Sequence, residues 1–413
     1  MHRISGVPAA SLDESADLLL DFAQAMHRVQ MPADAIEGHL RAIAARLGVS
    51  ADTLLLQSAI AVEVRDGSGE RVALRRIGFE AHWRLARVRE LIDLADACAA
   101  GAYSPVRARA RLRAILAERW HVPRFAVVTA YGVYGAAVAA RVGGRDGEML
   151  VAALAGLLTG FVHYVAIGRR ALDLQKVFAA TLAATLLVLG CATVFEVDGG
   201  RALFGGITLL VPASAITIGT HELANDALES GTSRLAYALV RFLMIAAGLA
   251  AAIKLWMLLA PLPPPTHVAP LPAPEVLAIL VAGGLALVLC LQARPSDAPW
   301  IVFGVLVAYG AQALTKRVFG PDGAPLIAAF VLGVAGYAHA RVVRDGLPAT
   351  VIVPGLLQIS TGFLGTQAVF GLLRGEAGGH ATFFQVFLVA FQLVGGLLLA
   401  SVLFADRRRS GAE

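Results

Sequence analysis

The 413-residue chain has few cysteines and few charged residues, and each shortage excludes a class of protein. Its three cysteines, Cys98, Cys191 and Cys290, stand far apart and form no Cys-x-x-Cys or Cys/His ligand pattern. This excludes a disulfide scaffold and a zinc site, and we predict no metal and no cofactor. Charged residues make up only 16% of the chain, against about 25% in soluble globular proteins. An ordinary soluble enzyme is therefore excluded as well.

The charged residues are distributed unevenly along the chain. Of the first 124 residues 32 are Arg, Asp or Glu, whereas the remaining 289 residues contain only 33 charged side chains. The first section has the charge content of a water-soluble domain, and the second that of a chain largely in lipid. We predict a small α/β domain at 1–124, called the head below, followed by a polytopic helical membrane domain. Arg and carboxylates alternate along the head, so the net charge of +5 does not indicate nucleic acid binding.

Apolar spacing and turn residues predict the elements of the head. An amphipathic helix is predicted at 16–29 behind Ser11 and Asp13, and a second one at 33–47 that ends at Gly48. Three strands are predicted at 53–57, 60–65 and 71–76, with a hairpin turn at 66–69, and helices at 82–99 and from Ser104-Pro105 onward. The turn lacks the downstream glycine and helix of a nucleotide-binding loop. The first residues contain no apolar run of signal-peptide length, so we expect a cytoplasmic head.

From residue 125 onward the sequence contains ten long apolar stretches. A membrane-spanning helix needs about 17 to 25 residues, so the first, sixth and seventh stretches are short for a span. We predict ten membrane helices, with eight or nine as the alternatives. The stretches are 125–140, 149–167, 177–197, 202–220, 235–260, 276–291, 300–314, 324–343, 350–373 and 383–404.

A proline-rich connector at 261–275 divides the membrane domain into two halves, 125–260 and 276–405, which a tail at 406–413 follows. Five helices in each half would make the two halves inverted in topology, which is a common plan among transporters. The loops on the side of the head together with the tail hold ten Arg and Lys residues, and the loops on the other side six. This asymmetry predicts that the head and the tail are both cytoplasmic.

The fourth apolar stretch of each half contains a proline among small and polar residues. Proline removes a backbone donor, so both stretches are predicted to be broken helices whose freed backbone groups can coordinate a small polar solute. The alternative is a kinked helix that packs through small residues. The candidate substrate-binding residues are Pro212, Thr217, Gly219 and Thr220 in the first half, and Pro354, Gly355, Gln358, Ser360, Thr361 and Gly362 in the second.

Carboxylates follow the first of these segments. On a helix, Glu222, Asp226 and Glu229 would lie on one face, and their repulsion would raise the pKa of at least one toward the range useful for carrying a proton. The alternative is an ordinary hydrated loop helix.

Four ionisable residues fall inside the apolar stretches, where exposure to lipid is costly. We expect Arg241 and Lys254 to extend toward the ends of their helix, whereas His163 and His339 are candidates for a ligand or proton role. The candidates for proton coupling are Glu222, Asp226 and His163.

The layout and several motifs resemble the threonine/serine exporter family, bacterial inner-membrane exporters with a cytoplasmic N-terminal domain and ten spans. The motifs that carry the resemblance are Glu37, Leu47-Gly48 and the turn at 101–105 in the head, Pro212, Glu222, Ser230-Gly231 and Arg234 in the first half, and Val353-Pro354-Gly355 in the second. The chain departs from the family pattern at Ala35, Ala213, Glu222 and Thr361-Gly362, where the family usually has Arg, Gly, Asp and Pro-Gly.

The resemblance implies a transporter and no enzyme: an antiporter of the bacterial inner membrane that exports small polar amino acids in exchange for protons. Some two-chain relatives of similar design handle dicarboxylates, which are therefore an alternative solute. Two other hypotheses stay open on the residues alone, a membrane-tethered enzyme or signalling module acting through the head, and a pore without coupling. The expected partners are the bilayer, protons and a small polar solute, and no nucleic acid.

Overall fold

The computed structural model describes residues 11–56, 58–77, 84–118, 122–165, 173–264, 266, 269–320, 323–343, 346–359, 371 and 379–405. The chain divides into two compact units. Unit 1 comprises Met1–His121 together with His221–Arg234, and unit 2 comprises Val122–Thr220 and Leu235–Glu413. The segment His221–Arg234, called the inserted segment below, therefore belongs to unit 1 although the chain on both sides of it belongs to unit 2.

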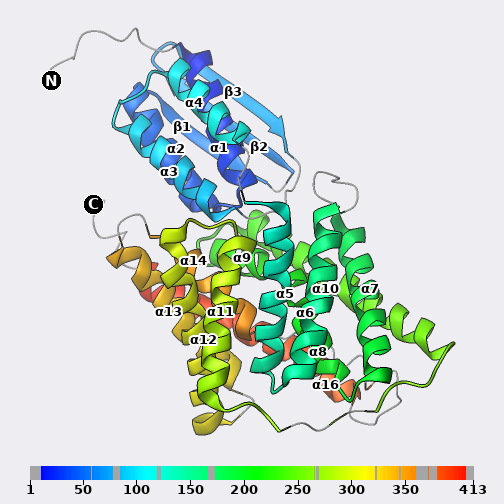
Figure 1. Cartoon of the computed structure of the whole chain (residues 1–413). Coiled ribbons are helices and arrows are strands. Elements are labelled where there is room, and N and C mark those ends of the chain that lie inside the picture. Colours follow the sequence, from blue (N-terminus) through cyan, green and yellow to red (C-terminus); the bar gives the residue numbers. More distant parts are fainter. Residues whose placement is uncertain are drawn as a thin grey trace. The chain divides into compact units, whose positions relative to one another are not determined.

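Unit 1 contains a three-stranded antiparallel sheet with helices on one face (Figure 1). The buried side chains of Ile60, Val62 and Val64 mark the face against which α1 and α2 pack, whereas Leu54 and Leu74 on the opposite face are exposed. The strands pair in the order β1-β2-β3. The elements are α1 (Leu12–Arg28), α2 (Ala33–Leu47), β1 (Ser50–Leu55), β2 (Ala59–Asp66), β3 (Gly69–Arg76), α3 (Leu85–Ala99) and α4 (Pro105–Ala117).

The ends of these elements follow local sequence signals. Ser11 and Glu14 form a capping box at the start of α1, which is why this helix begins four residues before the predicted Ala16. Gly48, at a φ of +77°, ends α2 as predicted, and Ser104 caps α4 ahead of Pro105. The predicted range of the first strand was wrong by about three residues, because pairing with β2 begins at Ser50 and ends at Leu55.

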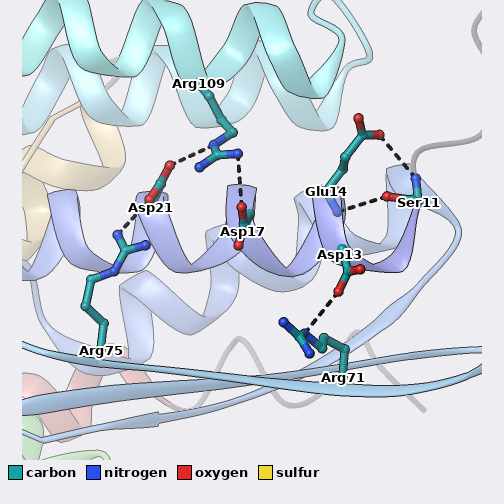
Figure 2. A network of polar contacts seen from close by, with 8 residues as sticks. All are labelled: Ser11, Asp13, Glu14, Asp17, Asp21, Arg71, Arg75 and Arg109. Carbon is teal, nitrogen blue, oxygen red and sulfur yellow. Dashed lines mark hydrogen bonds and ion pairs between the residues drawn. The ribbon is translucent and has the colours of Figure 1, made fainter.

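Ion pairs connect α1 to its neighbours in unit 1. Three aspartates of α1 follow one another at four-residue intervals and therefore share one face of the helix (Figure 2). The arginines opposite them come from β3 and α4. The pairs are Arg71–Asp13 at 3.0 Å, Arg75–Asp21 at 2.7 Å, Arg109–Asp17 at 3.1 Å and Arg109–Asp21 at 2.8 Å.

Unit 2 is helical, and a helix lies at each of the ten apolar stretches. Of the described helices, seven are long and apolar enough to cross a membrane, or eight if the bent pair α8–α9 counts as one span. Helices α11 and α12, which form at the short sixth and seventh apolar stretches, are long enough to cross a membrane by this measure. Helix α5 and the 12-residue α14 are not counted as spans. A total of ten spans stays a prediction. The helices are α5 (Arg124–Arg141), α6 (Asp146–Val165), α7 (Asp173–Val194), α8 (Gly199–Ile207), α9 (Ala213–Ala224), α10 (Leu228–Met257), α11 (Ala273–Cys290), α12 (Ala298–Phe319), α13 (Ala324–Val342), α14 (Pro348–Ile359) and α16 (Gly379–Ala405).

The helices of unit 2 largely repeat one pattern of neighbours, with the exception that α5 also packs on α8, a contact that α11 and α14 do not match among the described residues. Helix α5 packs on α6, α6 on α7 and α8, and α7 on α8. In the same chain order, α11 packs on α12, α12 on α13 and α14, and α13 on α14. The last helix of each set also approaches the third, since Gly248 of α10 lies against Phe178 of α7 and Gly396 of α16 against Leu326 of α13. The two sets meet where α5 packs on α11.

Glycines allow several of these helices to approach backbone to backbone. A Cβ atom added at Gly135 of α5 would lie 2.8 Å from the carbonyl oxygen of Ala152 on α6, and one added at Gly205 of α8 would overlap the carbonyl oxygen of Gly135. The same is true of Gly304 on α12, which faces the carbonyl oxygen of Val351 on α14. Small residues at such positions are typical of helix packing in membranes, where close van der Waals contact drives association.

The two proline-containing segments differ. At Pro212 the chain bends by 56° between the helical stretches Gly199–Leu210 and Ala213–Ala224, which confirms the predicted break. The predicted break at Pro354 was wrong for the described residues, because Pro354 lies inside the continuous helix α14. Every residue from Thr350 to Ile359 is buried, so packing on α12 and α13 holds the helix together around the proline. Ser360, Thr361 and Gly362 lie outside the described residues.

Candidate functional site

The inserted segment does not form the single helix that the sequence predicted. Helix α9 ends at Ala224, Asp226 adopts a left-handed conformation at a φ of +62°, and α10 begins at Leu228. Asn and Asp tolerate this conformation and favour turns, so Asn225-Asp226 ends the helix. Asp226 is exposed and no longer shares a helical face with Glu222. The prediction of three carboxylates on one face was therefore wrong.

Glu222 forms a buried ion pair with Arg234, at the other end of the inserted segment. The two side chains are 0% and 1% exposed, and Arg234 Nε donates to Glu222 Oε2 at 2.9 Å. The other carboxylate oxygen, Oε1, accepts the backbone N–H of Ala33 at 3.2 Å, and Arg234 Nη2 donates to the carbonyl oxygen of Met31 at 3.4 Å. The ion pair thus connects both ends of the inserted segment to the turn between α1 and α2.

The local sequence explains why α2 takes a carboxylate from so far away. Its N-cap residue is Pro32, which offers no side-chain acceptor to the free N–H groups of the first turn. Glu222, 189 residues later in the chain, supplies the acceptor and places a negative charge at the positive end of the helix dipole. His221 adds a further contact, since its Nε2 lies 3.2 Å from Oδ2 of Asp34 in the same turn of α2.

Two titratable side chains of α1 and α2 lie in the same part of unit 1. Burial, together with the nearby positive charge of Arg234, lowers the pKa of His27 to about 3, so that its imidazole is neutral at physiological pH. Burial also raises the pKa of Glu37, with Arg41 acting against the shift and Asp34 adding to it. Unit 1 therefore accommodates one buried ion pair and keeps the adjacent histidine uncharged.

The break at Pro212 has its own hydrogen-bond partner in unit 2. Arg241 Nη2 of α10 donates to the carbonyl oxygen of Leu210, one of the groups left free where the helix bends, at 3.0 Å. The expectation that Arg241 extends toward the helix end was therefore wrong. Thr217 Oγ1 donates to the carbonyl oxygen of Ala213 within α9, and Thr220 is buried in the same helix.

The candidate residues on α14 lie among different neighbours. Gln358 Nε2 donates to the hydroxyl oxygen of Tyr134 on α5 at 3.0 Å, and both side chains are fully buried. This bond joins the second set of helices to the first. Pro354 and Gly355 are buried in the packed interior of the same helix, where a Cβ at Gly355 would overlap the side chain of Leu332 on α13.

The two histidines of unit 2 contact aromatic rings. His163, in the last turn of α6, has its ring 5.7 Å from that of Tyr131 on α5. His339 of α13 is buried, and its ring lies 4.5 Å from that of Trp300 on α12. Lys254 is exposed. Among the residues that the structure describes, no group of three or more His, Cys, Asp or Glu side chains could hold a metal ion.

Sequence reasoning passed over several polar residues that the structure brings together. Arg141 closes α5, and because it directly follows the apolar stretch it was counted as a loop charge. Its guanidinium donates to Oε1 of Gln312 on α12 and lies 5.7 Å from the ring centre of Phe204. Its place seven residues after Tyr134 on one helix face is a signal that could have found it, because the two side chains then point in similar directions. Arg234 was noted as a loop charge and as part of a motif, without a partner.

Comparison with known proteins agrees with a multi-pass membrane protein. Two fungal relatives are both named Pheromone-regulated membrane protein 10. The protein of Eremothecium gossypii is 28% identical over 267 residues, which cover 61% of this chain and 35% of the relative. That of Candida glabrata is 24% identical over 272 residues, 63% of this chain and 34% of the relative. The chain thus spans about a third of the length of these curated relatives.

A family model gives the more specific match. The model described as "Putative threonine/serine exporter" matches residues 17–256, which contain the described part of the head from Asp17, the inserted segment and the helices from α5 to α10. No solved structure matches the chain. The matched residues make up more than half of the sequence, and the chain therefore belongs to the threonine/serine exporter family.

Proposed function

We propose that the chain is a secondary transporter that exports small polar amino acids of the threonine/serine type in exchange for protons. The observation that carries this proposal is the broken helix at Pro212, set in a bundle whose two sets of helices largely repeat one pattern of neighbours. Transporters built from repeated halves bind polar solutes where such helices are interrupted. Small dicarboxylates are the alternative solute, since nothing in the 212–220 segment selects for an amino group.

The proposal includes a topology. The excess of Arg and Lys in the tail and the loops on the side of the head supports a cytoplasmic head and tail, and the odd number of apolar stretches in each half supports inverted halves. The membrane would be the inner membrane of a bacterium. In this arrangement the solute passes between residues 212–220 of the first half and residues 354–362 of the second, where Thr217, Thr220, Gln358, Ser360 and Thr361 supply polar contacts.

Glu222 is the proposed site of proton exchange. In its charged form it holds Arg234 and the N-terminus of α2, with one carboxylate oxygen toward each. Protonation would neutralise the carboxylate and weaken both bonds, so that uptake of a proton loosens the inserted segment from residues 31–34. Asp226, exposed four residues later, and His163, in the last turn of α6, are the further candidates for carrying the proton.

Transport in inverted membrane vesicles tests the proposed function. Vesicles that contain the full chain are offered labelled threonine, serine and succinate, with and without an uncoupler. In these vesicles export is seen as uptake, and we expect uptake of at least one solute to fall to the passive level when the uncoupler removes the proton gradient. Uptake that is unchanged by the uncoupler and saturates only at very high solute concentration would indicate a pore. The absence of uptake of any of the three solutes would contradict export.

A pair of carboxylate variants tests the role of Glu222. In Glu222→Gln we expect gradient-driven uptake to be lost while exchange of labelled for unlabelled solute, which needs no net proton movement, continues. The matched control is Glu229→Gln, because Glu229 is exposed on the same segment. Retained exchange shows that the variant is folded. If Glu222→Gln shows gradient-driven uptake at the rate of the unmodified protein, Glu222 is not the site of proton exchange.

A further inference from the structure

A second polar cluster lies in unit 2, where α5, α12 and α14 supply side chains near one another. Arg141 and Tyr134 lie seven residues apart on α5, a spacing that puts them on the same helix face about 10 Å apart along the axis. Ala137 and Val138 between them are buried, so this face points into the bundle. Arginine side chains on a helix lean back toward its N-terminus, which brings the guanidinium toward Tyr134.

Arg141 is partly exposed, and it lies beside uncharged groups and one further cation. Its guanidinium contacts the amide oxygen of Gln312, 3.3 Å from Nη1, and the ring of Phe204. Lys316, one turn after Gln312 on α12, lies near enough for its charge to repel that of Arg141. Within the described ranges of the chain no carboxylate pairs with Arg141, and its Nε is buried without a hydrogen-bond partner.

The neighbouring Tyr134–Gln358 pair also has an unused group. The amide nitrogen of Gln358 is occupied by the tyrosine hydroxyl, but its buried Oε1 has no hydrogen-bond partner in the described part of the chain. Buried polar groups without partners cost about 1 to 3 kcal/mol each, and an unpaired cation costs more. Such groups are expected where a ligand completes the hydrogen bonding, and ionisable residues inside a helix bundle are most often functional.

We infer that Arg141, with Gln312 and the Tyr134–Gln358 pair, forms a binding site for the carboxylate group of the transported solute. The planar guanidinium presents paired N–H donors that match the two oxygens of a carboxylate, and Lys316 strengthens the attraction for an anion. Gln358 Oε1 accepts a hydrogen bond from an N–H or O–H group elsewhere in the solute. This inference rests on the proposed function for its solute, and it names the chemical feature that amino acids and dicarboxylates share.

The site selects for a carboxylate rather than for a particular side chain. A solute whose carboxylate is replaced by a carboxamide keeps its size but loses the charge that Arg141 binds, and one acceptor oxygen becomes an NH2 donor. The site should therefore discriminate strongly between an acid and its amide. It should discriminate less between threonine and serine, because a single methyl group contributes little to binding.

Equilibrium binding to the full chain in detergent tests the inference without requiring transport. Labelled threonine, serine and succinate are used as probes, and threoninamide, serinamide and the diamide succinamide, none of which has a carboxylate, as competitors. We expect Arg141→Gln to weaken binding of the best acid about tenfold or more and to remove most of the preference for acid over amide. Arg141→Lys should retain part of the affinity, since lysine keeps the positive charge but lacks the paired N–H donors of the guanidinium. Arg317→Gln, an exposed basic residue of α12, is the matched control and should change binding less than about twofold.

The outcomes separate the inference from the proposed function. If the unmodified protein binds an acid in preference to its amide and Arg141→Gln does not, the inference stands whether or not vesicles transport the solute. If Arg141→Gln is monodisperse and binds acid and amide with unchanged selectivity, the inference is overturned even when transport is intact. The same conclusion follows if the unmodified protein binds none of the acids, or binds acid and amide equally.

Discussion

The two units surround an arginine in opposite ways: Arg234 is fully buried, whereas Arg141 is partly exposed. In unit 1, Arg234 is 1% exposed and is held by Glu222, whose second oxygen is taken by the N-terminus of α2. In unit 2, Arg141 lies beside an amide, an aromatic ring and a second cation, with no carboxylate partner among the described residues. The first cation is neutralised by a carboxylate within the protein, although Arg234 Nη1 has no hydrogen-bond partner among the described residues. The second cation has no carboxylate partner there, and this difference distinguishes a charge that holds the fold from one that is available to a ligand.

The packing around the two arginines differs in the same sense. Unit 1 is connected by side chains that carry opposite charges, as in the stripe of aspartates on α1 that meets arginines of β3 and α4 (Figure 2). Several helices of unit 2 are connected by backbone contacts at glycine. A polar group that is left over in unit 1 can find water or a counter-charge. One left over in unit 2 has to be satisfied by another helix or by the solute.

The largest effect is expected where the ion pair of unit 1 is broken. Arg234→Met leaves the carboxylate of Glu222 buried without its cation, which should lower the free energy of unfolding of unit 1 by about 3 to 5 kcal/mol. Hydrogen exchange of the amides in α1 and α2 of the full chain measures this loss directly. Arg141→Met strands no buried carboxylate and should leave the amide protection of α5 and α12 within about 1 kcal/mol of its original value.

A double variant checks the cause of that loss. Replacing both partners, in Glu222→Leu with Arg234→Met, removes the stranded charge and should recover much of the lost protection, although α2 still lacks its acceptor. Arg71→Met is the matched control, because Arg71 and Asp13 are both largely exposed and such pairs contribute about 1 kcal/mol or less. A double variant no more stable than Arg234→Met would show that the ion pair is not the source of the effect.

Glycine substitutions sharpen the contrast in packing. Gly205→Ala in α8 would push a methyl group into the carbonyl oxygen of Gly135, and we expect a loss of about 1 to 3 kcal/mol in the stability of unit 2. Gly38→Ala in α2 has open space around it and should stabilise unit 1 by about 0.5 to 1 kcal/mol. Gly190→Ala in α7 is the control within unit 2, since nothing lies near its added Cβ. Thermal unfolding in detergent compares the three, and a Gly205→Ala variant as stable as Gly190→Ala would contradict the argument.

The predictable part of the fold is the part governed by neighbours in the sequence. Capping by Ser11, the helix end at Gly48, the hairpin at 66–69 and the break at Pro212 all follow from residues within one or two turns. The unbroken helix at Pro354 did not follow, because its integrity depends on burial against α12 and α13. A single sequence contains the proline but does not show the neighbours that compensate for it.

For the same reason, only part of the candidate site could be predicted from the sequence. Glu222 was identified from its place after the broken helix. Its partner Ala33 is 189 residues away, and Met31, the partner of Arg234, is 203 residues away. Both make their contacts through backbone atoms, which leave no trace in a motif. Asn225-Asp226 is a turn signal that the prediction of one helix through Glu222, Asp226 and Glu229 did not consider. Arg141 was missed because a charge at the end of an apolar stretch is usually a loop residue, and only the packing of α5 on other helices turns it inward.

Acidification tests whether unit 1 excludes a second buried cation. His27 has a pKa of about 3 in the folded chain against 6.5 when unfolded, so the unfolded state binds a proton first as the pH falls. The stability due to neutral His27 is therefore complete above pH 6.5 and is lost between pH 6.5 and about 3, at about 1.4 kcal/mol per pH unit. Amide protection of α1 at pH 7.5 and 5.5 measures it, with allowance for the intrinsic exchange rate.

Two histidine variants show whether His27 is responsible. His27→Leu removes the titrating group and should flatten the pH dependence between 7.5 and 5.5. His39→Gln, which replaces a partly exposed histidine beside Asp96, should leave the dependence in place. An equal slope in His27→Leu and the unmodified chain would mean that another group of unit 1 is titrating.

The smallest effect is expected at the local cap of α1, which contrasts with the distant cap of α2. Helix α1 is capped by Ser11 and Glu14 from its own first turn, in an exposed position, whereas the first turn of α2 takes its acceptor from Glu222. Ser11→Ala should therefore cost only about 1 kcal/mol and should fray the first turn of α1 alone, because water can replace the lost acceptor. Glu222→Ala removes the acceptor of α2 and also strands Arg234, so its effect should extend along α2 and into the inserted segment. Hydrogen exchange resolves the two cases by position, and a Ser11→Ala variant that also deprotected α2 would show that the two caps are coupled through α1.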